Sequence, residues 1–205
     1  SNNIEAGIKN SLLGKRLQLN ITAFYTRVTD AQVPTLILPD AVTITKNAGQ
    51  LTSSGIELEV SAAPVQGLQV DYNFGYSNAS YSNLKLSQNG SVADLDGKKQ
   101  IYTPEETSML ALQYEYASGK KQRVRLTARA ECFFIGKQYF DLSNNIKQND
   151  YSLYNIRFGI TAKNTSLMFW ARNLSDKKYI AYAYDFGAIH LGDPKTIGAT
   201  LSYNF

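Results

Sequence analysis

The feature that most constrains this chain is an alternation of apolar and polar side chains that persists for about ten residues at a time and recurs along the sequence. From 68 to 77, apolar or aromatic residues occupy every second position, and polar or small residues occupy the others. Side chains of a β-strand point to opposite faces in turn, so this segment has one apolar and one polar face. The sequence predicts a strand that contacts two different environments.

Eight segments show this pattern, and a ninth, 167–172, is apolar on both faces near its start. No long window has the apolar spacing of a helix with a capping signal. The abundance of Tyr and Phe, 14 and 9 residues, also favours strands. We predict an all-β chain with one domain, because no linker rich in Pro, Gly or Ser divides it. The nine predicted strands are 4–9, 17–26, 56–62, 68–77, 110–116, 123–134, 154–162, 167–172 and 196–205.

The connections between these strands alternate between short and long. Short turns are predicted near 13–15, 64–67, 118–121 and 163–165, and long polar loops near 30–48, 83–106, 141–150 and 184–194. In an antiparallel up-and-down order, all short turns then lie at one end of the sheet and all long loops at the other. The turn signals Asn89-Gly90 and Asp96-Gly97 suggest a small hairpin in the second long loop, or else two isolated turns.

Strand length favours a membrane over water as the environment of the apolar face. A soluble β-sandwich also alternates polar and apolar residues. Strands of about ten residues, however, match the length that crosses a bilayer at a tilt, whereas ordinary strands have about five or six. Short turns at one end, long loops at the other and aromatic residues near both ends are typical of an outer-membrane β-barrel. In that architecture the polar face lines the lumen.

Composition narrows the remaining function classes. The net charge of +4 comes without a concentrated basic stripe, so we predict no nucleic-acid partner. Cys132 is the only cysteine, which excludes an internal disulfide framework and a paired-cysteine metal site. The chain opens Ser-Asn-Asn-Ile without an initiator Met or a signal segment, and we expect it to be cut from something longer.

Four stretches give the chain a family resemblance: 4–10 (IEAGIKN), 47–59 (from NAG to SGIELE), 170–179 (WARNLSDKKY) and 192–205 (GDPKTIGATLSYNF). Together they resemble the C-terminal half of TonB-dependent outer-membrane receptors. The resemblance implies a barrel of about 22 strands, an N-terminal plug domain inside it and a segment that engages the TonB complex of the inner membrane. It also implies import of a scarce extracellular ligand, namely an iron chelate, a cobalamin or a glycan.

Nine is an odd count, and single-chain bacterial barrels have an even number of strands. We therefore expect residues 1–205 to be the C-terminal segment of a transmembrane barrel in the outer membrane, with the plug and the N-terminal strands outside it. Its expected partners are lipid, the plug and remaining strands, the TonB complex, the barrel-assembly machinery and the imported ligand. No cofactor is predicted.

Candidate site residues follow from this placement. The aromatic and imidazole groups expected to contact ligand at the long-loop end are Tyr81, Tyr102, Tyr139, Tyr182 and His190, although the tyrosines could instead be interfacial anchors. The arginines expected to face a plug from the lumen wall are Arg123, Arg125, Arg129, Arg157 and Arg172. The terminal residues Leu201, Tyr203 and Phe205 resemble the signal that the barrel-assembly machinery reads.

We predict no catalytic or metal site. His190 is the only histidine, and neither a nucleophile motif nor companion ligands lie near it. Two alternatives to the active-transport receptor stay open at this point. One is a segment of a passive outer-membrane porin, and the other is a soluble β-sandwich that binds a ligand.

Overall fold

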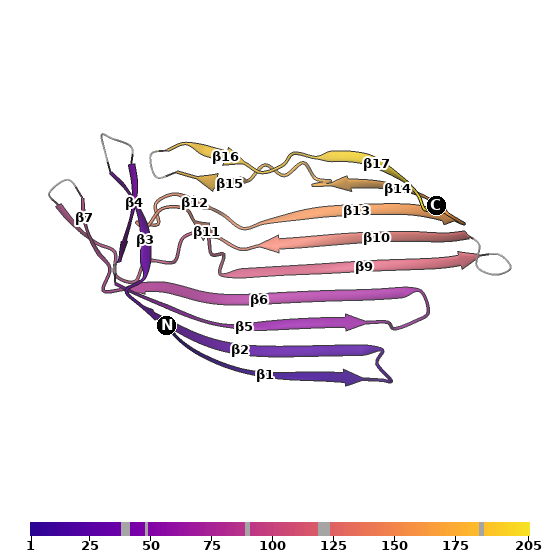
Figure 1. The fold of residues 1–205 in the computed structure, drawn as a ribbon, viewed down its shortest axis with the longest axis horizontal. Coiled ribbons are helices and arrows are strands. Elements are labelled where there is room, and N and C mark those ends of the chain that lie inside the picture. Colours follow the sequence, from indigo (N-terminus) through magenta and orange to yellow (C-terminus); the bar gives the residue numbers. More distant parts are fainter. Residues whose placement is uncertain (38–41, 48, 89–90, 119–123, 185–186) are drawn as a thin grey trace.

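The nine predicted strands are all present and pair in sequence order. The structure is a computed structural model that describes residues 1–37, 42–47, 49–88, 91–118, 124–184 and 187–205. Within these residues nine long strands form one antiparallel, up-and-down sheet (Figure 1). They are β1 (Asn2–Leu12), β2 (Leu17–Thr29), β5 (Gln50–Ala62), β6 (Leu68–Ser82), β9 (Glu106–Ser118), β10 (Val124–Ile135), β13 (Tyr151–Ala162), β14 (Thr165–Arg172) and β17 (Thr196–Tyr203).

Several strands extend further toward the long loops than the alternation predicted. β5 begins at Gln50, six residues before the predicted start at Ile56. The added residues are mostly polar or small and so show no alternation, but their backbones pair in register with β2 and β6, as at Gln50 opposite Thr29 and Ser82. Backbone pairing with two neighbours therefore sets the strand length here, and side-chain pattern does not.

The connections lie at opposite ends of the sheet, as predicted. The described short turns are 13–16, 63–67 and 163–164. A fourth short turn is predicted near 118–121, but residues 119–121 are outside the described part of the chain. Figure 1 shows the long connections gathered at the other end, where they form small hairpins. The hairpin strands are β3 (Gln32–Ile37) with β4 (Val42–Asn47), β7 (Lys85–Gln88) with β8 (Ser91–Asp94), β11 (Gln138–Tyr139) with β12 (Lys147–Gln148), and β15 (Ile180–Ala183) with β16 (Ile189–Leu191).

The hairpin suggested for the second long loop is confirmed, because β7 pairs with β8 from Lys85 opposite Asp94 to Gln88 opposite Ser91. Its turn residues 89 and 90 are outside the described part of the chain. The second turn signal is also a turn: Gly97 has a φ of +72° and donates its N–H to the carbonyl of Tyr81 at 2.9 Å.

The apolar face of the sheet is not buried, unlike that of a soluble protein. Apolar side chains on one face are open, with Ile4 71%, Phe158 51% and Leu201 72% exposed. On the other face the side chains of Arg129 and Asp71 are only 14% and 19% exposed. No second sheet covers the apolar face anywhere in the described ranges. A large uncovered apolar face needs an apolar environment, and a tilted β-sheet of this length meets one in a bilayer.

A small core lies among the long connections. Val33, Tyr81, Leu84 and Leu95 are buried together there, with Leu51 and Leu142 packed against them. This core joins the first two long connections to the ends of β5 and β6. No helix in the described part of the chain is long and apolar enough to cross a membrane.

Candidate functional site

Hydrogen bonds from Tyr102 join the long connections at the loop end. Tyr102, in the connection before β9, donates its N–H to the carbonyl of Tyr139 in β11 at 2.8 Å. Its hydroxyl donates to the carbonyl of Ala183 in β15, also at 2.8 Å. One tyrosine thus joins three connections that are far apart in the sequence.

Aromatic contacts reinforce these ties. The Tyr102 ring stacks on the Tyr182 ring, with centroids 5.1 Å apart and planes 13° apart. The Phe140 ring is tilted against the Tyr102 ring, with centroids 5.5 Å apart, and Tyr184 meets Tyr182 edge to face at 4.7 Å. We call Tyr102, Phe140, Tyr182 and Tyr184 the loop aromatic cluster. Phe140 is buried, but Tyr102, Tyr182 and Tyr184 remain 38%, 40% and 47% exposed, so the cluster presents ring surface to the outside.

Further polar contacts fix the positions of these connections. The N–H of Ile180 donates to the Gln148 side-chain oxygen at 2.8 Å, which ties β15 to β12. Lys99 and Asn144 exchange two hydrogen bonds, of 2.7 and 3.1 Å, between the second and third long connections. A surface held in this way can meet a ligand with little loss of loop entropy on binding.

The structure brings four of the five predicted ligand-contacting residues together. Tyr102, Tyr139 and Tyr182 share the contacts described above, and His190 in β16 lies directly opposite Tyr182 in the hairpin register. Tyr81 does not join them: its side chain is 5% exposed and packs in the loop core with Val33, Leu84 and Leu95.

Two lysines lie beside Tyr139, namely Lys137 and, directly opposite it in the β11–β12 register, Lys147. The ammonium of Lys137 is 5.2 Å from the centre of the Tyr139 ring, and its hydrogen bond to Tyr139 raises the pKa of Lys137. A cation and exposed tyrosine rings can bind a ligand that combines negative charge with planar groups. Among the residues the structure describes, no three His, Cys, Asp or Glu side chains are grouped so as to hold a metal ion.

The polar face of the sheet carries a charged network centred on Arg129. Its Nε donates to Glu131 Oε1 at 2.7 Å, and its Nη1 lies 3.5 Å from Asp71 Oδ2 and 3.4 Å from Gln113 Oε1. Ala111 lies in register between Asp71 and Glu131 and is fully buried. Its small side chain leaves room for the guanidinium to reach across β9 to Asp71 on β6, whereas Glu131 lies two residues along β10 itself.

The other predicted lumen arginines lie on the same face but are more open. Arg125 is 3.9 Å from Glu115, with a side chain that is 57% exposed. Arg157 is the direct cross-strand neighbour of Arg129, and Arg172 lies 5.2 Å from the Trp170 ring. Within the described residues neither Arg157 nor Arg172 has an acidic partner in a salt bridge. Arg123 lies outside those residues.

The predicted assembly signal lies at the short-turn end, with Leu201 and Tyr203 on β17 and Phe205 just beyond it. Leu201, Tyr203 and Phe205 are exposed, and the last two rings meet edge to face at 5.2 Å. β17 pairs only with β14, so its other edge is open among the described strands.

Sequence reasoning missed Phe140, Tyr184 and Asn173. Asn173 is 5% exposed and holds a turn together by donating to the carbonyls of Lys177 and Asp193 and accepting from the N–H of Lys177. The two aromatics could have been found by their position next to predicted tyrosines. Asn173 gave no signal, because a polar residue in a polar connection is ordinary.

Comparison with known proteins places this geometry in one family. A family model described as "TonB dependent receptor-like, beta-barrel" matches residues 1–174. The ferrioxamine receptor of Yersinia enterocolitica is 25% identical over 170 residues, which cover 77% of this chain and 21% of that protein. The ferrichrome outer membrane transporter and phage receptor of Escherichia coli is 21% identical over 174 residues, or 82% of this chain and 22% of that protein.

Solved structures agree on the fold. The ferric yersiniabactin uptake receptor FyuA from Yersinia pestis matches 99% of this chain and 30% of its own with a TM-score of 0.80 at 20% identity. The siderophore receptor PiuA from Acinetobacter baumannii matches 98% of this chain and 28% of its own, with a TM-score of 0.79 at 22% identity. The chain therefore spans between a fifth and a third of the length of these relatives.

Proposed function

Because the chain belongs to the TonB-dependent receptor-like β-barrel family, we propose that it forms part of an outer-membrane receptor that binds a ferric siderophore at its loop end and imports it. Siderophores are preferred over a cobalamin or a glycan because the relatives named above are receptors for ferrioxamine, ferrichrome and other siderophores. Those names describe the relatives, and their extension to this chain is the proposal.

The observation that carries the proposal is the loop aromatic cluster. Tyr102 and Tyr182 come from different connections, stack on each other and keep about two fifths of their surface open. Tyr139, whose ring lies 5.2 Å from the Lys137 ammonium, accepts a hydrogen bond from the Tyr102 N–H at its carbonyl, and His190 lies opposite Tyr182 in the hairpin register. Rigid aromatic surface with polar groups around it suits a compact chelate at low entropic cost. We assign ligand contact to Tyr102, Tyr139, Tyr182 and His190, and we propose that Tyr81 supports them from the loop core.

Import needs parts that these nine strands do not supply. We propose that they close into a barrel of about 22 strands with others of the same receptor. A plug domain would fill the lumen against Arg125, Arg129, Arg157 and Arg172, and against Arg123. The TonB complex would drive transport, and the barrel-assembly machinery would read Leu201, Tyr203 and Phe205. The relatives' greater length, three to five times that of the matched region, supports the existence of such parts.

Uptake of radioactive iron tests the proposal. The protein is expressed from its complete gene in an Escherichia coli strain without siderophore receptors of its own, and uptake of iron from ferrioxamine B is measured with and without a functional TonB gene. We expect uptake that needs both the protein and TonB. Uptake that persists without TonB would instead indicate a passive porin, and absence of binding at the cell surface would exclude this siderophore as the ligand.

A further inference from the structure

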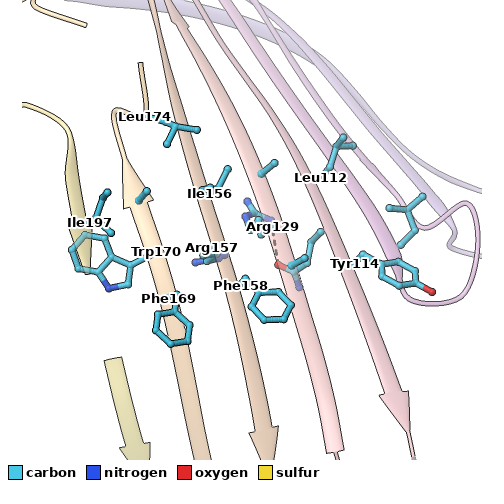
Figure 2. Close-up of a pocket in the computed structure, with 15 residues that line it drawn as sticks. Leu112, Tyr114, Arg129, Ile156, Arg157, Phe158, Phe169, Trp170, Leu174 and Ile197 are labelled. Carbon is cyan, nitrogen blue, oxygen red and sulfur yellow. Dashed lines mark hydrogen bonds between the residues drawn. The ribbon is translucent and has the colours of Figure 1, made fainter. Parts of the chain in front are cut away.

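The apolar face of the sheet is not flat but contains a hollow of about 630 Å³ (Figure 2). Along β10 its floor consists of Ala128 and Ala130. Tyr114 and Leu112 of β9 lie opposite these alanines on one side, and Phe158 and Ile156 of β13 lie opposite them on the other. We call the open groove over Ala128 and Ala130 the alanine furrow. Two small side chains between two pairs of large ones create it, and every one of these six side chains is apolar or aromatic.

The width of the alanine furrow decides what can enter it. Adjacent strands are about 4.8 Å apart, so β9 and β13 are separated by about 9.6 Å between backbones, and their side chains narrow that space further. An α-helix with side chains is about 10–12 Å wide and does not fit. An added β-strand needs a free strand edge, which the middle of a paired sheet does not offer. A hydrocarbon chain is slender, needs no hydrogen bonds and is abundant on this face.

Basic residues follow the loop end of the hollow in the sequence. Leu174 lines the hollow there, and the turn that carries Leu174 also carries the exposed Lys177 and Lys178. Asn173 clamps this turn by its contacts with Lys177 and Asp193, and Asp176 accepts a hydrogen bond from the N–H of Lys195 at 2.9 Å. The turn is therefore fixed at the edge of the apolar face, where headgroups of lipids lie. Two acidic residues, Asp176 and Asp193, only partly offset the three lysines in this area.

We propose that the alanine furrow binds an acyl chain of a phosphate-bearing lipid of the outer membrane, and that the lipid phosphate lies beside Lys177 and Lys178. The occupant is one lipid molecule, held more tightly than the lipids that surround the rest of the apolar face. Apolar contact along the furrow supplies the affinity, and the lysines select for negative charge. This site is separate from the loop aromatic cluster and does not depend on which ligand the receptor imports.

Native mass spectrometry of the protein expressed from its complete gene and purified in mild detergent tests this site. Two probes with identical acyl chains are compared, dimyristoyl phosphatidylglycerol and dimyristoylglycerol, which lacks the phosphate. We expect one molecule of the phosphate-bearing probe to stay bound, and Ala130→Phe to lower its affinity by about fourfold for each methylene group that the ring displaces. Ala23→Phe adds the same ring to the apolar face on β2, away from the hollow, and should leave the affinity unchanged.

Further outcomes separate the parts of the proposal. Lys177→Gln with Lys178→Gln should weaken the phosphate-bearing probe and leave the diacylglycerol unaffected, and equal weakening of both would overturn the headgroup assignment. If Ala130→Phe does not assemble, Ala128→Leu narrows the same furrow with a smaller side chain. Equal lipid retention in the furrow variants and in Ala23→Phe would overturn the acyl-chain site. A protein dimer lost on Ala130→Phe would overturn it as well, because the occupant would then be a second copy.

Discussion

Tyr102 and Tyr182 stack with their ring centroids 5.1 Å apart, and the hydroxyl of Tyr102 donates a hydrogen bond to the carbonyl of Ala183, the residue after Tyr182. The pair fixes the β15–β16 hairpin against the connection that precedes β9, and it leaves an aromatic surface open at the loop end.

Tyr182→Ala should weaken siderophore binding. The substitution removes ring surface from the proposed site and a stacking contact worth about 0.5–1.5 kcal/mol, so we expect the Kd to rise up to about tenfold. Equilibrium binding of iron-loaded ferrioxamine B to cells checks this. Tyr182→Phe should bind nearly as the native protein does, and so should Tyr25→Ala, which removes an exposed tyrosine from β2. A Kd in Tyr182→Ala equal to that in Tyr25→Ala would mean that the cluster has no role in binding.

Tyr102→Phe should loosen the hairpin while it keeps the ring stack. Loss of the hydrogen bond to Ala183 costs about 0.5–1.5 kcal/mol and should raise the local opening of the β15–β16 hairpin by about tenfold at most. Amide hydrogen exchange at Ile180 to Ala183 measures this opening. The β11–β12 hairpin, which meets Tyr102 through its backbone, serves as the internal control. Unchanged exchange at Ile180 to Ala183 would show that the hydroxyl does not hold the hairpin.

The strands were predictable from the sequence, whereas the contacts among the loop-end residues were not. Every strand but β14, which is apolar on both faces near its start, is marked by its own alternation, which is local, and the order of short and long connections then determines the up-and-down topology. The contact of Tyr102 with Tyr182 depends instead on how two long connections fold over the sheet, and neither has a period that reports this. The burial of Tyr81 also depends on how the long connections fold, because Tyr81 packs there against Val33, Leu84 and Leu95.

The lumen network was partly predictable. Arg129 was expected on the polar face from its position in the alternation of β10. Its partner Glu131 is two residues along the same strand, but its partner Asp71 comes from the register across β9, where Ala111 occupies a position that the pattern assigns to a polar residue. A small residue on the polar face beside an arginine is a signal that sequence reasoning can use in other barrels.

Arg129→Ala should destabilise the folded protein more than Arg125→Ala. The first change leaves Asp71 and Glu131 without their shared cation on a face where these side chains are about one fifth exposed, at a cost of about 1–3 kcal/mol. Arg125 is more than half exposed and 3.9 Å from its partner, so its loss should cost between about 0 and 1 kcal/mol. Urea unfolding in lipid vesicles gives both free energies. Equal losses for the two variants would contradict the special role of the network.

A charge on the apolar face of β6 should harm assembly, and one on its polar face should not. Val70→Asp places a carboxylate toward the hydrocarbon at a cost of about 2 kcal/mol or more, whereas Asn73→Asp places it toward the lumen. The folded yield in outer membranes, read from the heat-dependent shift in gel mobility, compares them. Similar yields for the two variants would mean that the two faces of β6 are not in different environments.

Spin labelling along β6 tests the central claim, that the sheet separates hydrocarbon from an aqueous or protein-filled lumen, most directly. Cys132 is replaced by Ala in the protein from its complete gene, single cysteines are introduced one at a time from 68 to 77, and each nitroxide is probed in bilayers with oxygen and with a water-soluble nickel chelate. We expect oxygen accessibility to peak at every second position. The expected peaks are Leu68, Val70, Tyr72, Phe74 and Tyr76, with low nickel accessibility at the same five sites. Accessibility without a period of two, or high nickel accessibility on both faces, would contradict the membrane-spanning account.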